Sequence, residues 1–163
     1  MRNSVDVHNY LIERDAAHEV FRARGRLRSP ERIAAVLDLP PSEVGKVRIF
    51  EGPSGPVAAI VPAGYEADPD RLRRAMGRKA LQPVTDDRAS ELTGYLPEST
   101  PPAGLPDGFS VVLDHSLDRD AVLYFPGGEV RSVLKIRGKD LVKATGARVA
   151  AIAEPAEDVR SGR

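Results

Sequence analysis

The chain has 163 residues, enough for one domain that buries about two thirds of the surface its unfolded form exposes. It contains no cysteine, which excludes disulfide bonds, thiolate zinc sites and cysteine nucleophiles. Its 24 basic and 24 acidic residues cancel, so no overall charge attracts it to nucleic acid. No apolar run reaches signal-peptide length or the roughly 20 residues of a membrane span, and we therefore expect a cytoplasmic protein.

The first part of the chain predicts two helices, a strand and a β-hairpin. Val7, Tyr10 and Leu11 have helical spacing after Ser4, which can act as the N-cap. Residues 18–23 alternate as a strand does. Ser29 as N-cap and Pro30 at the first helical position predict a second helix over 29–39. Two apolar runs within 46–62 flank a Gly-Pro-Ser-Gly turn, which indicates a hairpin.

The second part predicts an α+β fold. Asp68 and Thr85 have N-cap positions for short helices over 68–77 and 85–94, and the proline-rich segment 95–108 predicts a loop. Strands over 109–114, 121–125 and 131–136, a helix over 138–146 and a strand over 148–152 complete the chain order. Because strands and helices do not alternate regularly, we expect a mixed or barrel-like sheet rather than a doubly wound one.

Two clusters of basic residues stand out against the balanced charge. The first alternates along 22–28, and the second crowds residues 71–79. Such clusters are typical of solvated faces, and also of a margin that binds phosphates, and their spacing leaves both interpretations open. The members are Arg22, Arg24, Arg26 and Arg28, then Arg71, Arg73, Arg74, Arg78 and Lys79.

The residue types of a hydrolase triad occur in a row at Asp114-His115-Ser116. Neighbouring residues on a strand point to opposite faces, so these three cannot align as nucleophile, base and orienting acid. We interpret them as a strand end and a turn, with Ser116 capping the segment after it. The histidines His8, His18 and His115 show no i,i+4 pairing, so no zinc site is expected.

Several segments in series resemble the YbaK/ProX family of trans-acting aminoacyl-tRNA editing domains, which is related to the insertion domain of bacterial prolyl-tRNA synthetase. The resemblance runs from about Val7 to Ile152 and keeps the family's order. The segments are SPERIAAVLDLPPSEVGKVRIF, PVAAIVPAGYEADPDRLRRAMG, ELTGY, GFSVVLDHSL, VLYFPGGEVRSVLKI and KDLVKATGARVAAI. It implies one editing domain over 1–153 with a curved, YbaK-like sheet, and a flexible tail over 154–163.

The resemblance also implies the site residues. Lys46 falls on the family's V-x-K-T-L lysine, which is tied to deacylation, although Val47 replaces the threonine. After Thr93-Gly94-Tyr95, the family's Gly-x-x-x-Pro pocket loop aligns Pro102 and Gly104 with its proline and following glycine. Glu98 and Ser99 stand where its leading glycines are expected, and the remaining implied substrate-binding residues are Asp114, Gly127 and Gly128.

By resemblance, the protein hydrolyses the ester of mischarged aminoacyl-tRNA in trans, without a cofactor or metal. Lys46 and backbone N–H groups of the Pro102 and Gly127-Gly128 loops would form the site, and a ribose hydroxyl of the substrate would help to position water. The expected partners are the tRNA 3′ end and also a synthetase or elongation factor, not DNA or a membrane. Monomer and homodimer both stay open. The arginines expected on tRNA phosphates are Arg22, Arg24, Arg26, Arg28, Arg73 and Arg74.

Glu98 leaves two alternatives to ordinary editing. A glycine lets backbone approach a substrate carbonyl closely, and a glutamate in its place could block the pocket. The protein would then be a catalytically lapsed member that binds tRNA, a synthetase or a small ligand. Glu98 could instead pair with a cationic aminoacyl group.

Overall fold

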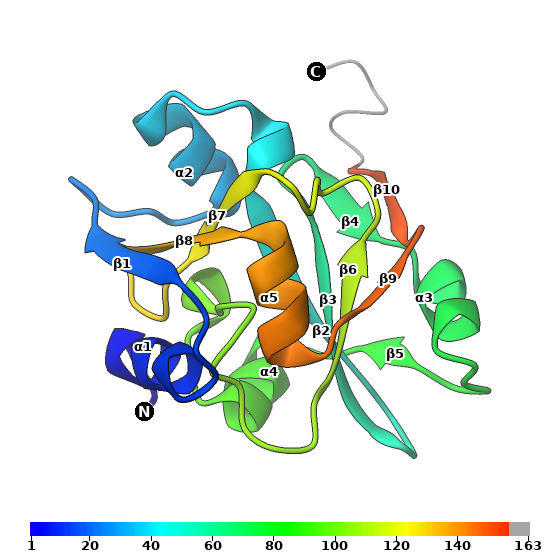
Figure 1. Ribbon diagram of the computed structural model, residues 1–163. Helices are drawn as coiled ribbons and strands as arrows, with labels where there is room; N and C mark the ends of the chain where they lie inside the picture. Colours follow the sequence, from blue (N-terminus) through cyan, green and yellow to red (C-terminus); the bar gives the residue numbers. More distant parts are fainter. Residues whose placement is uncertain (157–163) are drawn as a thin grey trace.

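The computed structural model describes residues 1–156, in which three β-sheets carry the fold (Figure 1). The largest sheet is mixed: β2 and β3 form an antiparallel hairpin, and β3, β6 and β9 run parallel. A second, antiparallel sheet has the order β1-β8-β7, and β10 pairs with β4 in a third. The five strands of the large sheet are, in order, β5 (Gln82–Pro83), β2 (Gly45–Gly52), β3 (Gly55–Pro62), β6 (Ser110–Asp114) and β9 (Arg148–Ala150). The others are β1 (His18–Arg22), β8 (Ser132–Arg137), β7 (Val122–Pro126), β4 (Tyr65–Ala67) and β10 (Ala153–Pro155).

Short helices surround these sheets (Figure 1). The helices are α1 (Ser4–Glu13), α2 (Pro30–Leu37), α3 (Pro69–Ala75), α4 (Asp86–Thr93) and α5 (Gly138–Thr145), with 3-10 turns η1 (Pro41–Glu43) and η2 (Pro97–Ser99). A single parallel bridge between Val44 and Tyr124 links the large sheet to the second one. The predicted α+β class with a mixed sheet is therefore confirmed.

The β2–β3 hairpin separates two apolar cores because successive side chains of a strand point to opposite faces. Val47 and Ile49 pack in the core that includes α1 and α5. Phe50 packs on the other face, with Leu72 of α3. Lys46 and Arg48 share the face of Phe50 by this alternation, at the end of β2 where α2 and β4 approach it.

The helix starts were predicted well, with one correction. Ser29, Asp68 and Thr85 accept hydrogen bonds from the backbone of the helices they precede. Helix α1 is capped by Asn3 rather than Ser4: the Asn3 side chain accepts from Val5 N–H, and Asp6 accepts from Asn3 N–H. This reciprocal capping box fixes the helix start one residue earlier than expected.

Three short strands, β4, β5 and β10, were not predicted from the sequence. Strand β10 contains Glu154 and Pro155, which were expected to belong to the flexible tail; pairing with β4 orders them. Ala156, also in the expected tail, donates its N–H to Gly64 C=O at 3.0 Å, and residues 157–163 lie outside the described residues. Within 1–156, no helix combines the length and apolar character needed to cross a membrane.

Candidate functional site

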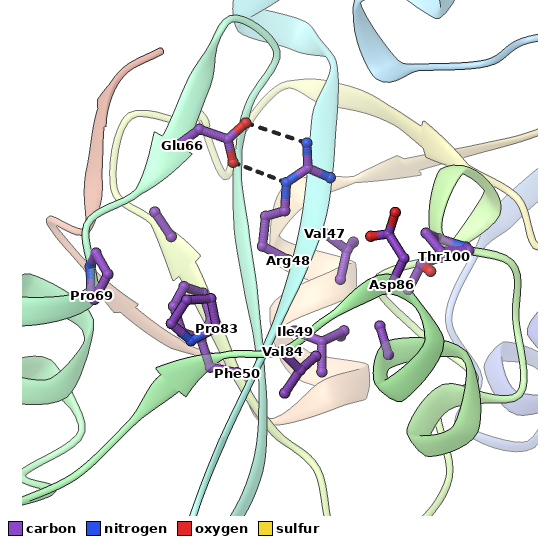
Figure 2. Close-up of a pocket in the computed structure, with 13 residues that line it drawn as sticks. Val47, Arg48, Ile49, Phe50, Glu66, Pro69, Pro83, Val84, Asp86 and Thr100 are labelled. Atoms are coloured by element: carbon purple, nitrogen blue, oxygen red, sulfur yellow. Dashed lines mark hydrogen bonds and ion pairs between the residues drawn. The ribbon is translucent and has the colours of Figure 1, made fainter. Parts of the chain in front are cut away.

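Two adjoining cavities lie along strand β2. The larger, of about 400 Å³, is lined by Lys46 together with residues from the segment before α2, the start of α4 and the η2 turn. The smaller, of about 180 Å³, continues along β2 toward β5 (Figure 2). Five residues line both cavities: Val47, Arg48, Asp86, Pro97 and Thr100.

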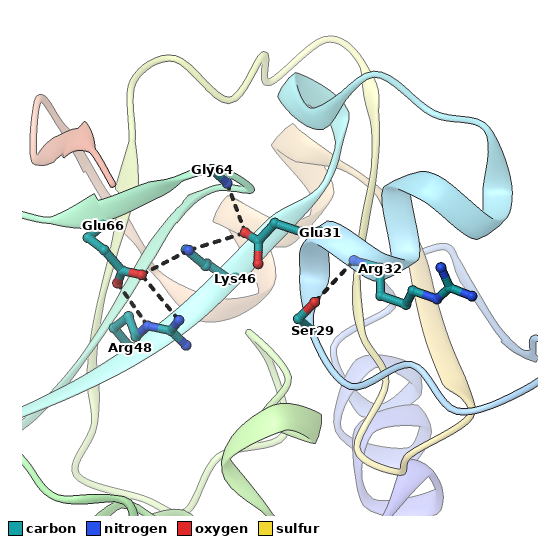
Figure 3. A network of polar contacts seen from close by, with 7 residues as sticks. All are labelled: Ser29, Glu31, Arg32, Lys46, Arg48, Gly64 and Glu66. Atoms are coloured by element: carbon teal, nitrogen blue, oxygen red, sulfur yellow. Dashed lines mark hydrogen bonds and ion pairs between the residues drawn. The ribbon is translucent and has the colours of Figure 1, made fainter. Parts of the chain in front are cut away.

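Lys46 is a buried cation at the wall of the larger cavity. Its side chain is only 4% exposed, and its Nζ lies 3.2 Å from Glu31 Oε2 and 2.9 Å from Glu66 Oε2 (Figure 3). An ammonium carries three N–H donors, so at least one remains for a group bound in the cavity. Lys46 is thus among the residues that line this cavity, and its catalytic role stays a prediction.

Glu31 and Glu66 connect Lys46 to its surroundings. Glu31 Oε2 also accepts a hydrogen bond of 2.8 Å from the N–H of Gly64, in the turn between β3 and β4. Glu66 accepts 2.9 and 3.3 Å hydrogen bonds from Arg48 in a bidentate pair. The four charged side chains thus form one network that holds α2, β2 and β4 together and fixes the Lys46 amine in place.

The same contacts lower the pKa of both carboxylates. Partial burial alone would raise the pKa of Glu31, but hydrogen bonds from Gly64 and Lys46 and the Lys46 charge outweigh it. For Glu66, burial is likewise outweighed by hydrogen bonds and charges from Arg48 and Lys46. Both pKa values therefore lie below the ordinary 4.5 of a glutamate.

This network predicts a specific loss of stability in acid. A carboxylate with a lowered folded-state pKa stabilises the fold fully above its unfolded pKa, here about 4.5, and this contribution disappears as pH falls through the folded value. We expect the denaturant midpoint of the wild type to fall more steeply between pH 5 and pH 3 than that of the double variant Glu31→Gln, Glu66→Gln. If the denaturant midpoints of the two proteins fell equally between pH 5 and pH 3, the proposed contribution of the network to stability would be contradicted.

Val47 lines the cavity, and its backbone groups belong to the edge of β2 that faces away from β3. Val44 C=O accepts from Ala63 N–H of the β3 side, whereas Ile49 C=O accepts from Val84 N–H on the opposite side of β2. Backbone groups alternate along a strand, so Val47 points its N–H and C=O away from β3, like Ile49. Strand β5 pairs only with Phe50 and Glu51, and in the described chain no strand pairs with β2 at Val47.

The proline-rich loop does not face a single cavity, contrary to expectation. Glu98, in η2, lines the Lys46 cavity and has no ion-pair partner among residues 1–156. Pro102 and Gly104 line a separate cavity of about 130 Å³ beside α1, where Gly104 C=O accepts a 2.7 Å hydrogen bond from the Tyr95 hydroxyl. This end of the loop therefore packs against α1 and Tyr95 and does not reach Lys46.

Gly127 and Gly128 also have a different role from the expected one. Gly127 N–H donates to Ser132 C=O at 2.9 Å, and Gly128 N–H donates to Ser99 C=O at 3.0 Å. Both donors are thus used within the fold and do not complete an anion site. Gly127 is required for close packing, because a Cβ there would lie 2.9 Å from the Ser132 backbone.

Asp114 lies apart from the Lys46 cavity, as a buried structural anchor. Its Oδ1 accepts from the N–H groups of Ile152 and Ala153 at 2.8 and 2.9 Å, and its Oδ2 accepts from the Ser116 N–H and hydroxyl. Burial raises the pKa of Asp114, but these hydrogen bonds outweigh it and hold the pKa below its ordinary value. Ser116 thus bonds back to the strand end instead of capping a later segment.

The two arginine clusters occupy different places. Arg28 lines the Lys46 cavity, and Arg22, Arg24 and Arg26 are exposed on β1 and the loop after it. Arg73 and Arg74 belong to α3, on the opposite side of the view in Figure 1. Of the six predicted tRNA contacts, Arg28 alone joins the cavity lining.

Sequence reasoning missed four side chains of this site: Glu31, Arg48, Glu66 and Asp86. Glu31 and Asp86 are in the first turns of their helices, where acidic residues are ordinary partners of the helix dipole. Glu66 lies on the unpredicted strand β4, so its approach to Lys46 had no local signal. Alternation along β2 could have placed Arg48 on the face of Lys46.

Comparison with known proteins agrees with this fold. A family model described as the aminoacyl-tRNA editing domain matches residues 25–144. Proline–tRNA ligases from three strains of Streptococcus thermophilus are 24% identical over 90 residues, which is 55% of this chain but 14% of each ligase.

Two solved structures share the fold. The hypothetical protein APE2540 has a TM-score of 0.85 and 26% identity, covering 91% of this chain and 99% of that one. A proposed trans-editing enzyme for prolyl tRNA synthetase has a TM-score of 0.83 and 24% identity, covering 93% of this chain and 96% of its own.

Proposed function

The chain belongs to the aminoacyl-tRNA editing domain family, and from this premise we propose that it hydrolyses the ester of mischarged aminoacyl-tRNA in trans, at the Lys46 cavity. The observation that carries the proposal is the placement of Lys46: a buried ammonium with a remaining N–H, on the wall of a cavity of about 400 Å³. Editing is useful because one binding site separates similar side chains by only about 1–3 kcal/mol.

The proposed reaction needs stabilisation of negative charge on the ester carbonyl oxygen. Water attacks the carbonyl carbon, the bond to the terminal ribose oxygen breaks, and that oxygen takes a proton as the free amino acid and tRNA form. Val47 and Lys46 both line this cavity, and we propose that the Val47 N–H and the remaining Lys46 N–H donate to the developing oxyanion. A ribose hydroxyl of the substrate is proposed to help position the water.

Arg28 is proposed to contact phosphate near the tRNA 3′ end, because it lines the same cavity and is exposed. We expect Arg28→Gln to raise the KM for aminoacyl-tRNA by about 3- to 10-fold and to reduce the salt dependence of binding by about one charge. The measurement is kcat and KM over a series of salt concentrations, with exposed Arg119→Gln as the control. A rise in KM of this size in Arg74→Gln, with no change in Arg28→Gln, would place the tRNA across α3 instead.

The test of the proposed function is a panel of mischarged tRNAs incubated with the pure protein, with ester loss followed over time. Hydrolysis above the spontaneous rate, absent in Lys46→Met, is the expected result. A protein that binds tRNA equally well with and without Lys46, but hydrolyses no member of the panel, would be the catalytically lapsed binder.

A further inference from the structure

The smaller cavity beside the Lys46 cavity has a different chemical character. Its volume of about 180 Å³ exceeds the roughly 150 Å³ of an apolar protein cavity that holds benzene. Most of its wall is aliphatic or aromatic carbon. The apolar lining residues are Val47, Ile49, Phe50, Ala67, Pro69, Pro83, Val84, Ala89 and Pro97.

The polar groups of this cavity are few, and one of them is free. Arg48 and Glu66 are bonded to each other, so they present a neutral pair. Asp86 lines both cavities and lies across from that pair (Figure 2). Within residues 1–156, no cation or hydrogen-bond donor pairs with its carboxylate. An unpaired carboxylate at the junction of a polar and an apolar cavity suits a ligand with an ammonium next to an apolar group.

We infer that the smaller cavity receives an apolar aminoacyl side chain, of valyl to phenylalanyl size, while Asp86 binds the α-ammonium of the same group. This inference rests on the proposed function and names its substrate class. The ester carbonyl would then lie between the two cavities, where Val47 presents its N–H. A lysyl or arginyl side chain is disfavoured because Asp86 is occupied by the α-ammonium, so the charge of that side chain would lose water in an apolar chamber with no second free carboxylate in its lining.

The size of the chamber is tested with amide-linked 3′-aminoacylamino-adenosines, which mimic the tRNA terminus and cannot be hydrolysed as esters. We expect the leucyl compound to bind at least 10-fold more tightly than the alanyl or lysyl one, because a small group leaves the cavity unfilled. Ala89→Leu, which fills the chamber, should abolish that preference, whereas exposed Ala35→Leu should keep it. Val84→Phe gives a second filling variant if Ala89→Leu does not fold.

The role of Asp86 is tested by its neutral variant. Asp86→Asn should weaken binding of the α-amino compound about 10-fold, yet leave unchanged an analogue whose α-amine is replaced by a hydroxyl. Asp87→Asn, on the next residue of α4 and outside the cavity lining, should change neither. Equal losses for both analogues in Asp86→Asn would overturn the assignment of the α-ammonium.

The binding assay separates this inference from the proposed function. Selective binding of apolar analogues without hydrolysis of any ester would support the side-chain pocket and refute the proposed activity. Hydrolysis with a preference for lysyl or alanyl esters, unaffected by Ala89→Leu and Val84→Phe, would support the proposed activity. It would overturn the assignment of the smaller cavity as the side-chain pocket. Equal binding of all analogues would also overturn the pocket.

Discussion

Lys46→Met is expected to lower ester hydrolysis by about 100-fold or more, the scale on which losing one donor at a developing oxyanion acts. The same change should lower the free energy of unfolding by about 2 kcal/mol, because Glu31 and Glu66 lose their shared cation. Both carboxylates are partly exposed and keep some contact with water, which limits this cost. The measurements are single-turnover deacylation and denaturant unfolding, with exposed Lys143→Met as the control.

A triple variant separates catalysis from folding. Adding Glu31→Gln and Glu66→Gln to Lys46→Met removes the Glu31 charge, which is left without a cation, and the Glu66 charge, which is left with Arg48 alone. Part of the lost stability should therefore recover. Activity should not recover, since the amine is still absent. Recovery of both properties would show that Lys46 only holds α2, β2 and β4 together.

Asp114→Ala is expected to lower the free energy of unfolding by about 3 kcal/mol, with little change in hydrolysis by the folded protein. Four donors, three from the backbone and one from Ser116, lose their acceptor, and each buried unpaired group costs about 1–3 kcal/mol before relaxation. Unfolding in denaturant and kcat/KM at a temperature where the variant stays folded are the measurements. Exposed Asp107→Ala should change neither.

The opposite result for Asp114→Ala would indicate that Asp114 belongs to the catalytic site. A large fall in kcat with unchanged stability would mean that the carboxylate contacts substrate, as the family resemblance implied. The structure places it at the end of β6, where it accepts from Ile152, just before β10, and from Ala153, the first residue of β10, so a loss of stability is the expected outcome.

Local sequence rules predicted the elements that depend on neighbouring residues. Ser29-Pro30 fixes the start of α2, and the Gly52–Gly55 turn fixes the register of the hairpin, because both signals act within a few residues. Strands β4 and β10 are each three residues long and are defined by pairing with each other across most of the chain. No local pattern could have predicted them.

In the candidate site, too, the sequence predicted what a motif marks and missed what contacts between distant segments create. The position of Lys46 was found because the order of motifs along the chain carries it. Its carboxylate partners come from α2 and from β4, at separations of 15 and 20 residues that only the folded backbone brings together. The N–H groups of Gly127 and Gly128 were misassigned because a glycine pair indicates a tight backbone approach, but not whether the partner is a ligand or another strand.

Single-turnover hydrolysis of mischarged tRNA tests the central claim most directly. Wild-type protein in excess, mixed with a tRNA carrying a labelled branched aliphatic amino acid, should release that amino acid at least 100-fold faster than the folded triple variant Lys46→Met, Glu31→Gln, Glu66→Gln. Equal release by the two proteins, or none above the spontaneous rate across the panel of mischarged tRNAs, would contradict hydrolysis at the Lys46 cavity.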